Sequence, residues 1–177
     1  QGMDTLYILY FITGQIAYFE DDYNTALYAF NQSVSKIPPE RADDLKAYFL
    51  YLYRANTNYQ QDKLDEAIAA YQKMMEQKPS PQAYSRAAHV RWLKGDLDAA
   101  RVLMRMSAQG SSAGDAEASA WAWSKLALYE LQAGALKQSA ASCELALELQ
   151  PGYAPALLAE GRVLMAENRF NDAVPLL

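Results

Sequence analysis

The sequence is poor in the side chains from which most catalytic and metal sites are built. It has one cysteine, Cys143, and one histidine, His89. A disulfide framework within the chain is therefore excluded, and so is the usual Cys/His zinc site. No serine or carboxylate stands at a spacing from His89 that marks a catalytic triad, and no glycine-rich phosphate loop follows a strand. We therefore expect a protein that is not an enzyme and that uses no metal or cofactor.

Long apolar runs and an excess of positive charge are also missing. The net charge of −5 argues against nonspecific binding to nucleic acid or to a membrane surface. The longest uncharged stretch near the start, residues 5–19, is shorter than the 18 or more apolar residues of a membrane span. No basic residues precede it, as they do in a signal peptide. We interpret this stretch as a buried helix, and the sequence does not indicate a compartment.

One phrase is abundant: "KGDLDAARVLM" at residues 94–104 returns in related form four more times. Aligning the five copies brings a small residue into register at intervals of 41, 33, 39 and 34 residues: Ala26, Ala67, Ala100, Ser139 and Ala173. Twelve residues before each of these anchors stands a second small residue: Gly14, Ala55, Ala88, Ala127 and Gly161. Small residues that face each other let two helices approach closely. The spacing therefore predicts helical hairpins that stack to bury their apolar faces.

Turn and end signals divide each hairpin. Residue types that tolerate turn geometry stand between its two helices: Asp21, Asp62, Gly95, Gly134 and Asn168. Prolines end three of the second helices, at residues 38, 79 and 151, and Ser112 takes the equivalent place in another. The side chains expected to cap the second helices are Asn24, Asp65, Asp98 and Asn171.

This pattern resembles the tetratricopeptide repeat (TPR) over residues 7–177. The resemblance implies an all-α fold: an α-solenoid of stacked antiparallel helical hairpins that forms one right-handed superhelical array over residues 1–177. The expected units are 7–38, 48–80, 81–112, 120–153 and a truncated 154–177, with insertions at about 39–47 and 110–119. We expect the first insertion to lengthen the helix that follows it, and the second to end in a capped helix start at Asp115.

Two remaining features have structural interpretations. Cys143 shares a packing register with Phe30 and Tyr71, which predicts a small buried core residue. The acidic pairs at residues 21–22 and 43–44 stand at expected helix starts, where carboxylates favour the helix dipole. We therefore expect these pairs to cap helices and to bind no metal.

In this family the first helices of the hairpins line a concave groove. Carrying the groove offsets onto this chain gives a candidate peptide-binding groove of Gln15, Tyr18, Tyr53, Asn56, Tyr59, Arg86, His89, Trp92, Trp121, Lys125 and Arg162. The set contains no carboxylate, so its cations are suited to an acidic or C-terminal carboxylate segment, and its aromatics to apolar contact. Family members that clamp two carboxylates are matched only in part, because Leu52 stands where such a clamp has a lysine. For any single residue, packing or solvation remains the alternative.

The sequence thus predicts a non-catalytic protein–protein interaction scaffold that binds a peptide or protein segment in its concave face, with no nucleic-acid or membrane partner. Two alternatives stay open. The chain is a helical regulatory or substrate-recruiting part of a larger enzyme, or it is a repeat module that self-assembles through its apolar C-terminal end, residues 170–177.

Overall fold

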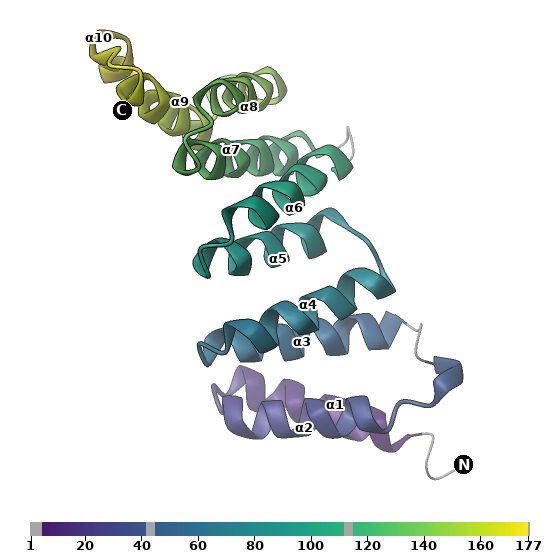
Figure 1. The fold of residues 1–177 in the computed structure, drawn as a ribbon. Coiled ribbons are helices and arrows are strands. Elements are labelled where there is room, and N and C mark those ends of the chain that lie inside the picture. The colour runs from purple at the N-terminus through teal and green to yellow at the C-terminus, as the bar shows by residue number, and fades with distance from the viewer. Residues whose placement is uncertain (1–4, 42–44, 112–114, 177) are drawn as a thin grey trace. The chain divides into compact units, whose positions relative to one another are not determined.

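The computed structural model describes residues 5–41, 45–111 and 115–176, and these form helices with no strand among them. The helices pair as antiparallel hairpins (Figure 1). The pairs are α1 (Leu6–Phe19) with α2 (Tyr23–Ser35), α3 (Leu45–Gln60) with α4 (Leu64–Gln77), α5 (Pro81–Leu93) with α6 (Leu97–Gly110), α7 (Ala116–Gln132) with α8 (Leu136–Leu149), and α9 (Ala154–Ala166) with the short α10 (Phe170–Ala173). The predicted all-α helical repeat solenoid is confirmed.

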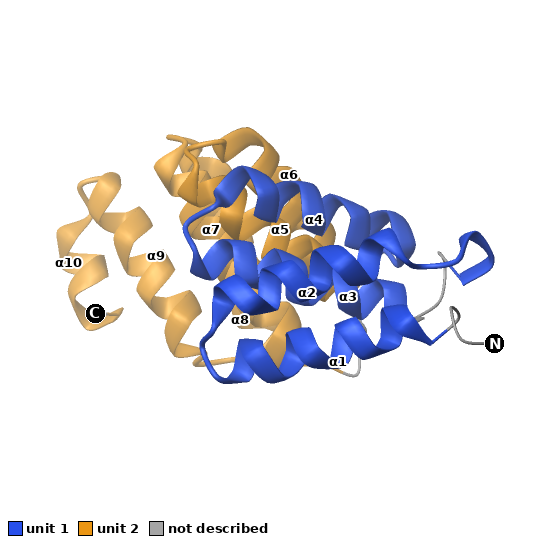
Figure 2. Ribbon diagram, turned by 90° about the horizontal axis from the view of Figure 1, so that it is seen from below, with its two compact units in different colours: residues 1–79 blue, residues 80–177 orange. Residues whose placement is uncertain are grey.

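The hairpins fall into two compact units (Figure 2). Unit 1 comprises residues 1–79 and contains α1 to α4, and unit 2 comprises residues 80–177 and contains α5 to α10. Within each unit the second helix of one hairpin packs against the first helix of the next. This contact joins α2 to α3 in unit 1, and α6 to α7 and α8 to α9 in unit 2.

The two rows of small residues are buried along the chain. The anchors and the small residues twelve positions earlier all lie in the interior, which is where closely approaching helices need them. The polar anchor, Ser139, satisfies its hydroxyl by donating a hydrogen bond of 2.7 Å to the backbone carbonyl of Ala127 on the facing helix. Cys143 is buried, as predicted, at the same register as Phe30 and Tyr71.

The turn residues adopt the left-handed conformation that their types favour. The backbone φ angle is 59° at Asp21, 60° at Asp62 and 62° at Asn168, against 81° at Gly95 and 73° at Gly134. Only glycine enters this region without strain, because a Cβ crowds the following carbonyl oxygen. The hairpin turns predicted from the sequence are therefore confirmed in backbone geometry.

At these turns, replacing aspartate by glycine is expected to stabilise the protein, and replacing glycine by alanine is expected to destabilise it. Asp62→Gly should raise the free energy of unfolding by up to about 1 kcal/mol, because it relieves the left-handed strain of a side-chain-bearing residue. Gly95→Ala should lower it by about 1–2 kcal/mol. No atom lies within 4 Å of a Cβ built at Gly95, so this cost comes from the backbone alone. Urea denaturation followed by circular dichroism measures both, and a loss of stability in Asp62→Gly contradicts the strain argument.

The predicted caps are wrong by two residues. The second helices begin at the large apolar residue itself, for example at Tyr23 and Leu97, so the capping position lies just before it. Asp22 accepts from the Thr25 N–H at 3.1 Å, and Asp96 accepts from the Ala99 N–H at 3.2 Å. The residues predicted as caps, Asn24, Asp65, Asp98 and Asn171, lie one residue inside the first turn instead.

The two insertions differ in the structure that they adopt. In the first, Pro39–Arg41 form a separate 3₁₀ turn, η1, and α3 begins at Leu45; the Asp43–Asp44 pair lies outside the described residues. In the second, α6 continues to Gly110, and α7 begins at Ala116 with Asp115 as its cap, accepting from the Ala118 N–H at 3.0 Å. The cap predicted at Asp115 is confirmed, whereas Ser112 lies outside the described residues. At the other end, α10 stops at Ala173 and the 3₁₀ turn η2 (Val174–Leu176) follows.

The expectation that residues 5–19 form a buried helix is only half right. The segment is helical, and its inner side, with Tyr7, Gly14 and Ala17, is buried. Its outer side keeps several large apolar side chains exposed, among them Leu9 and Ile16.

Unit 2 encloses a carboxylate in its helix packing. Glu130 of α7 is only 1% exposed. Its two oxygens have partners on neighbouring helices: Arg105 of α6 donates from Nη2 to Oε1 at 2.6 Å, and Ser142 of α8 donates to Oε2 at 2.7 Å. One buried side chain thus ties three helices together, and it satisfies the requirement that a buried charge be both paired and hydrogen-bonded.

Candidate functional site

The C-terminal ends of α5 and α7 are joined by an aromatic stack. The Trp92 ring lies over the Tyr129 ring with centroids 5.7 Å apart and an interplanar angle of 15°. The indole Nε1 of Trp92 also donates a hydrogen bond to the side-chain oxygen of Gln132. Trp92 also stacks with His89, with ring centroids 5.6 Å apart. These contacts fix the orientation of the predicted groove residues His89 and Trp92, because each ring is held by its neighbour.

Two cations lie on the same two helices as this stack. The ammonium of Lys125 on α7 sits 5.9 Å from the centre of the Trp121 ring, a distance at which a cation is attracted to an aromatic face. The guanidinium of Arg86 on α5 donates to the backbone carbonyl of Gln82 at 3.3 Å. Among the described residues, neither cation forms an ion pair with a carboxylate. We call the surface formed by Arg86, His89, Trp92, Trp121 and Lys125 the α5–α7 face.

The single histidine titrates in this electrostatic setting. Partial burial, and then the positive charge of Lys125, hold the pKa of His89 below its ordinary value of 6.5. Both causes disfavour the imidazolium form. His89 is therefore neutral at pH 7 and presents an uncharged ring to a ligand on the α5–α7 face.

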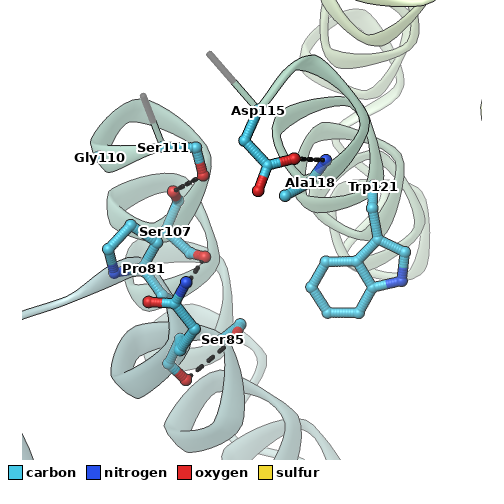
Figure 3. Close-up of a pocket in the computed structure, with 9 residues that line it drawn as sticks. Pro81, Ser85, Ser107, Gly110, Ser111, Asp115, Ala118 and Trp121 are labelled. Carbon is cyan, nitrogen blue, oxygen red and sulfur yellow. Dashed lines mark hydrogen bonds between the residues drawn. The ribbon is translucent and has the colours of Figure 1, made fainter. Parts of the chain in front are cut away.

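A pocket of about 380 Å³ opens where α5 and α7 begin. Figure 3 shows Trp121 and Asp115 on one wall, with Pro81, Ser85 and Ser107 across from them. The remaining lining residues are Gln82, Gly110, Ser111 and Ala118. The pocket lies directly beside the α5–α7 face, because Trp121 belongs to both.

Each of the three serine hydroxyls that line the pocket already donates a hydrogen bond to a backbone carbonyl. Ser85 donates to the Gln82 carbonyl at 3.1 Å, Ser107 to the Pro81 carbonyl at 2.8 Å, and Ser111 to the Ser107 carbonyl at 3.0 Å. A hydroxyl that donates to the backbone keeps its oxygen lone pairs for accepting. The pocket can therefore accept hydrogen bonds from N–H groups while Trp121 covers apolar surface.

The serine-lined pocket was missed in the sequence analysis. Its residues come from α5, from the end of α6 and from the start of α7, and only Trp121 was among the residues assigned to the groove. The one sequence feature that pointed to this region was the insertion at 110–119. It separates α6 from α7 and lengthens the interval between repeats at this point. The length of an insertion does not reveal which side chains its flanking helices bring together.

The predicted groove residues of unit 1 form an aromatic cluster of their own. Tyr18 and Tyr53 lie with ring centroids 5.5 Å apart, and Tyr53 also stacks with the fully buried Phe30 at 5.9 Å. The amide oxygen of Asn56 accepts a hydrogen bond of 2.6 Å from the Tyr71 hydroxyl. The remaining predicted residues of this unit, Gln15 and Tyr59, are half-buried. Packing within the unit thus occupies much of the surface of Tyr18, Tyr53 and Asn56.

Arg162 stands apart from the other predicted residues of unit 2. It is exposed on α9, the helix that packs against α7. The structure thus places Arg86, His89 and Trp92 on α5, Trp121 and Lys125 on α7, and Arg162 on a third helix.

Chemistry other than surface binding has little support in the described part of the chain. Residues 5–41, 45–111 and 115–176 hold no cluster of three or more histidine, cysteine or acidic side chains arranged for a metal ion. Burial, with smaller contributions from Glu160, Glu130 and Glu144, raises the pKa of the Cys143 thiol to about 12, so the thiolate nucleophile is not available near neutral pH. In those same ranges no helix combines the length and apolarity required to cross a bilayer.

Comparison with solved structures identifies the fold. A crystal structure of MamA superposes with a TM-score of 0.80 at 16% identity, covering 97% of this chain and 88% of that one. MamA from Desulfovibrio magneticus RS-1, from residue 41 to its end, gives a TM-score of 0.79 at 15% identity, with 98% and 92% covered. YrrB, described as a TPR protein with an unusual peptide-binding site, gives 0.73 at 13% identity, with 94% and 80% covered. No protein-family model and no curated protein matches the sequence. The likeness shows the TPR-type fold of this chain.

Proposed function

We propose that the chain is a non-catalytic protein-interaction scaffold that binds an extended, acidic peptide segment along the α5–α7 face. The observation that supports this most is the pair of cations, the exposed Arg86 and the half-buried Lys125, that form no ion pair with a carboxylate among the described residues. They lie on the two helices that carry Trp92, Trp121 and His89, in a chain whose net charge is −5. Cations that a protein leaves unneutralised beside exposed aromatic surface are suited to a carboxylate-bearing ligand.

The geometry suggests how such a segment is held. The carboxylates of the ligand pair with Arg86 and Lys125, and its apolar side chains contact Trp121 and the His89–Trp92 stack. The neighbouring pocket accepts one further side chain or backbone N–H group through the lone pairs of Ser85 and Ser107. His89 and Trp92 are already oriented by each other, and Trp92 also by Tyr129 and Gln132, so these two rings lose little side-chain entropy on binding.

Titration of tryptophan fluorescence tests this proposal. All three tryptophans lie on α5 and α7 in unit 2, so occupancy of the face changes their emission. Acidic-tailed peptides should bind, and more weakly as the salt concentration rises. Arg86→Glu/Lys125→Glu should weaken binding at least about tenfold, because each charge-assisted hydrogen bond contributes roughly 1.5–3 kcal/mol.

A matched variant separates the local effect from net charge. Lys63→Glu/Lys137→Glu changes the net charge by the same amount but at two exposed lysines that are not among the residues of the α5–α7 face, and it should bind like the original protein. Binding that is equally weakened in both variants, or that is indifferent to peptide charge, rejects the proposal.

The pKa of His89 gives an independent reading of the same site. With a single histidine in the chain, its imidazole resonance is unambiguous in an NMR titration. The pKa in the free protein should lie below 6.5, so the folded state loses a little stability as the pH falls below 6.5, where the unfolded chain binds the proton more readily. An acidic peptide should raise this pKa and therefore bind more tightly at pH 5.5 than at 7.5. A neutral peptide that raises it as much contradicts the charge complementarity.

A further inference from the structure

The outer side of α1 carries a continuous apolar stripe of Leu6, Leu9, Ile12, Ile16 and Phe19. Their exposed fractions run from 37% at Leu6 to 72% at Phe19. No other helix of the described residues leaves more than two large apolar side chains exposed. Exposed apolar surface of this extent on one helix marks a contact surface.

The repeat register shows what kind of surface the stripe is. Leu9 and Ile16 correspond to Leu50 and Thr57 on α3, to Ala122 and Tyr129 on α7, and to Ala156 and Val163 on α9. All six of these equivalents are buried. Each of those helices packs against the second helix of the hairpin before it, as when Ala122 and Tyr129 pack with Met104 of α6. The α1 stripe thus lies on the side with which the other first helices pack against a preceding helix. On α1 the apolar residues of this side are exposed.

We propose that the stripe is covered by α1 of a second copy of this chain, in an antiparallel pair around a twofold axis. The order of the stripe is symmetric about the middle of the helix, between Ile12 and Thr13. Leu6 stands as far before that point as Phe19 stands after it, and Leu9 as far before it as Ile16 after it. An antiparallel pair centred there brings apolar side chains together along the full contact, as a twofold interface requires.

Charge favours the same arrangement. The fourteen residues of α1 include no charged side chain, so no like charges meet across the axis.

Other occupants fit less well. A lipid surface favours helices with Lys or Arg along the polar side, whereas α1 has none and is followed by three acidic residues. Within residues 170–176, the described part of the C-terminal end, only Phe170 and Val174 are exposed apolar side chains, on a helix of four residues and a 3₁₀ turn. A self-paired α1 is about 21 Å long, and a contact of this size belongs to the weak, reversible class of interfaces.

Analytical ultracentrifugation of the full chain over a range of concentrations tests the proposal. The original protein should pass reversibly from monomer to dimer as the concentration rises. Leu9→Lys/Ile16→Lys should remain monomeric, with an unchanged circular dichroism spectrum because both side chains are exposed. Leu145→Lys/Leu149→Lys, on exposed positions of α8, should dimerise like the original. A protein that is monomeric throughout, or a dimer abolished by Phe170→Lys/Val174→Lys and not by the α1 variant, overturns the proposal.

Cross-linking tests the twofold geometry. In a Cys143→Ala background, Ile12→Cys should be joined into a covalent dimer by a short bismaleimide, because the axis passes beside it. Tyr28→Cys, exposed on α2 of the same unit, should not. Equal cross-linking of the two positions overturns the geometry. Binding of a monomeric protein to neutral or anionic lipid vesicles, lost in Leu9→Lys/Ile16→Lys, overturns the second copy as the occupant.

Discussion

Replacing Arg105 by alanine is expected to lower the free energy of unfolding of unit 2 by about 3 kcal/mol. The substitution leaves Glu130, a carboxylate only 1% exposed, with the Ser142 hydroxyl as its one remaining hydrogen-bond partner given by the structure. Removing one member of a buried pair typically costs about 3–5 kcal/mol, because the other charge stays buried without compensation. We take the lower end because the Arg105 side chain is 41% exposed, so water already screens part of the interaction.

A double-mutant cycle separates the loss of the charge pair from the loss of the arginine stem. Glu130→Gln alone should cost less than Arg105→Ala, since the amide carries no charge and can still accept from Arg105 or Ser142. Adding Glu130→Gln to Arg105→Ala should recover stability, because no buried charge remains. The tryptophans all lie in unit 2, so fluorescence during urea unfolding follows this unit directly. A loss below about 1 kcal/mol in Arg105→Ala, the range of exposed pairs, means that solvent reaches Glu130 and contradicts the argument.

The helix packing of this chain could be predicted from the sequence because it depends on side-chain size at fixed spacing. Where Gly14 must face Phe30, or Ala127 must face Ser139, only small residues fit, and the requirement leaves a periodic trace. The left-handed turns left an equally local trace, since Asp62 and Gly95 are types that tolerate positive φ. Features of this kind can be predicted without knowing which residues far apart in the sequence are in contact.

Features that depend on contacts between helices left no such trace. Glu130 is an ordinary charged residue in the sequence, and its burial follows only once α6 and α8 place Arg105 and Ser142 beside it. The caps were assigned two residues late because Asp98 and Asp96 are both plausible from composition. Only the backbone shows that Asp96 stands at the first free N–H groups.

The candidate site was accessible from the sequence in part. The groove offsets selected Arg86, His89, Trp92, Trp121 and Lys125 because first helices repeat their orientation from hairpin to hairpin. They did not reveal that Tyr129 and Gln132 hold Trp92, or that serines line a pocket beside Trp121. The exposure of the α1 stripe could not be predicted for a related reason. Its residues are of the same apolar types that are buried on other helices, and whether such a side chain is exposed depends on which helices pack against it.

Gly14→Ala is expected to destabilise unit 1 by about 1–2 kcal/mol, although alanine is the better helix former. A Cβ at this position would lie 2.5 Å from Cε1 of Phe30, well inside van der Waals contact. The Phe30 ring cannot retreat easily, because it is fully buried and packed against both Phe11 and Tyr53. Overpacking of this kind costs roughly 1–3 kcal/mol, which exceeds the gain of about 0.5–1 kcal/mol from removing a glycine within a helix.

Two further variants test whether Gly14→Ala destabilises the protein through the collision with Phe30. Gly110→Ala places its Cβ 3.4 Å from the Pro81 ring, an ordinary contact, so it should leave stability unchanged or slightly raised. Phe30→Leu removes Cε1 and Cζ, two of the three ring atoms nearest the new methyl, so Gly14→Ala should cost less in the Phe30→Leu background than alone. Thermal and urea unfolding followed by circular dichroism compares the four variants with the original protein. If Gly14→Ala is as stable as the original, the α1–α2 pair can move apart by a few tenths of an ångström at little cost, and close approach at the small residues is then not what fixes the hairpin.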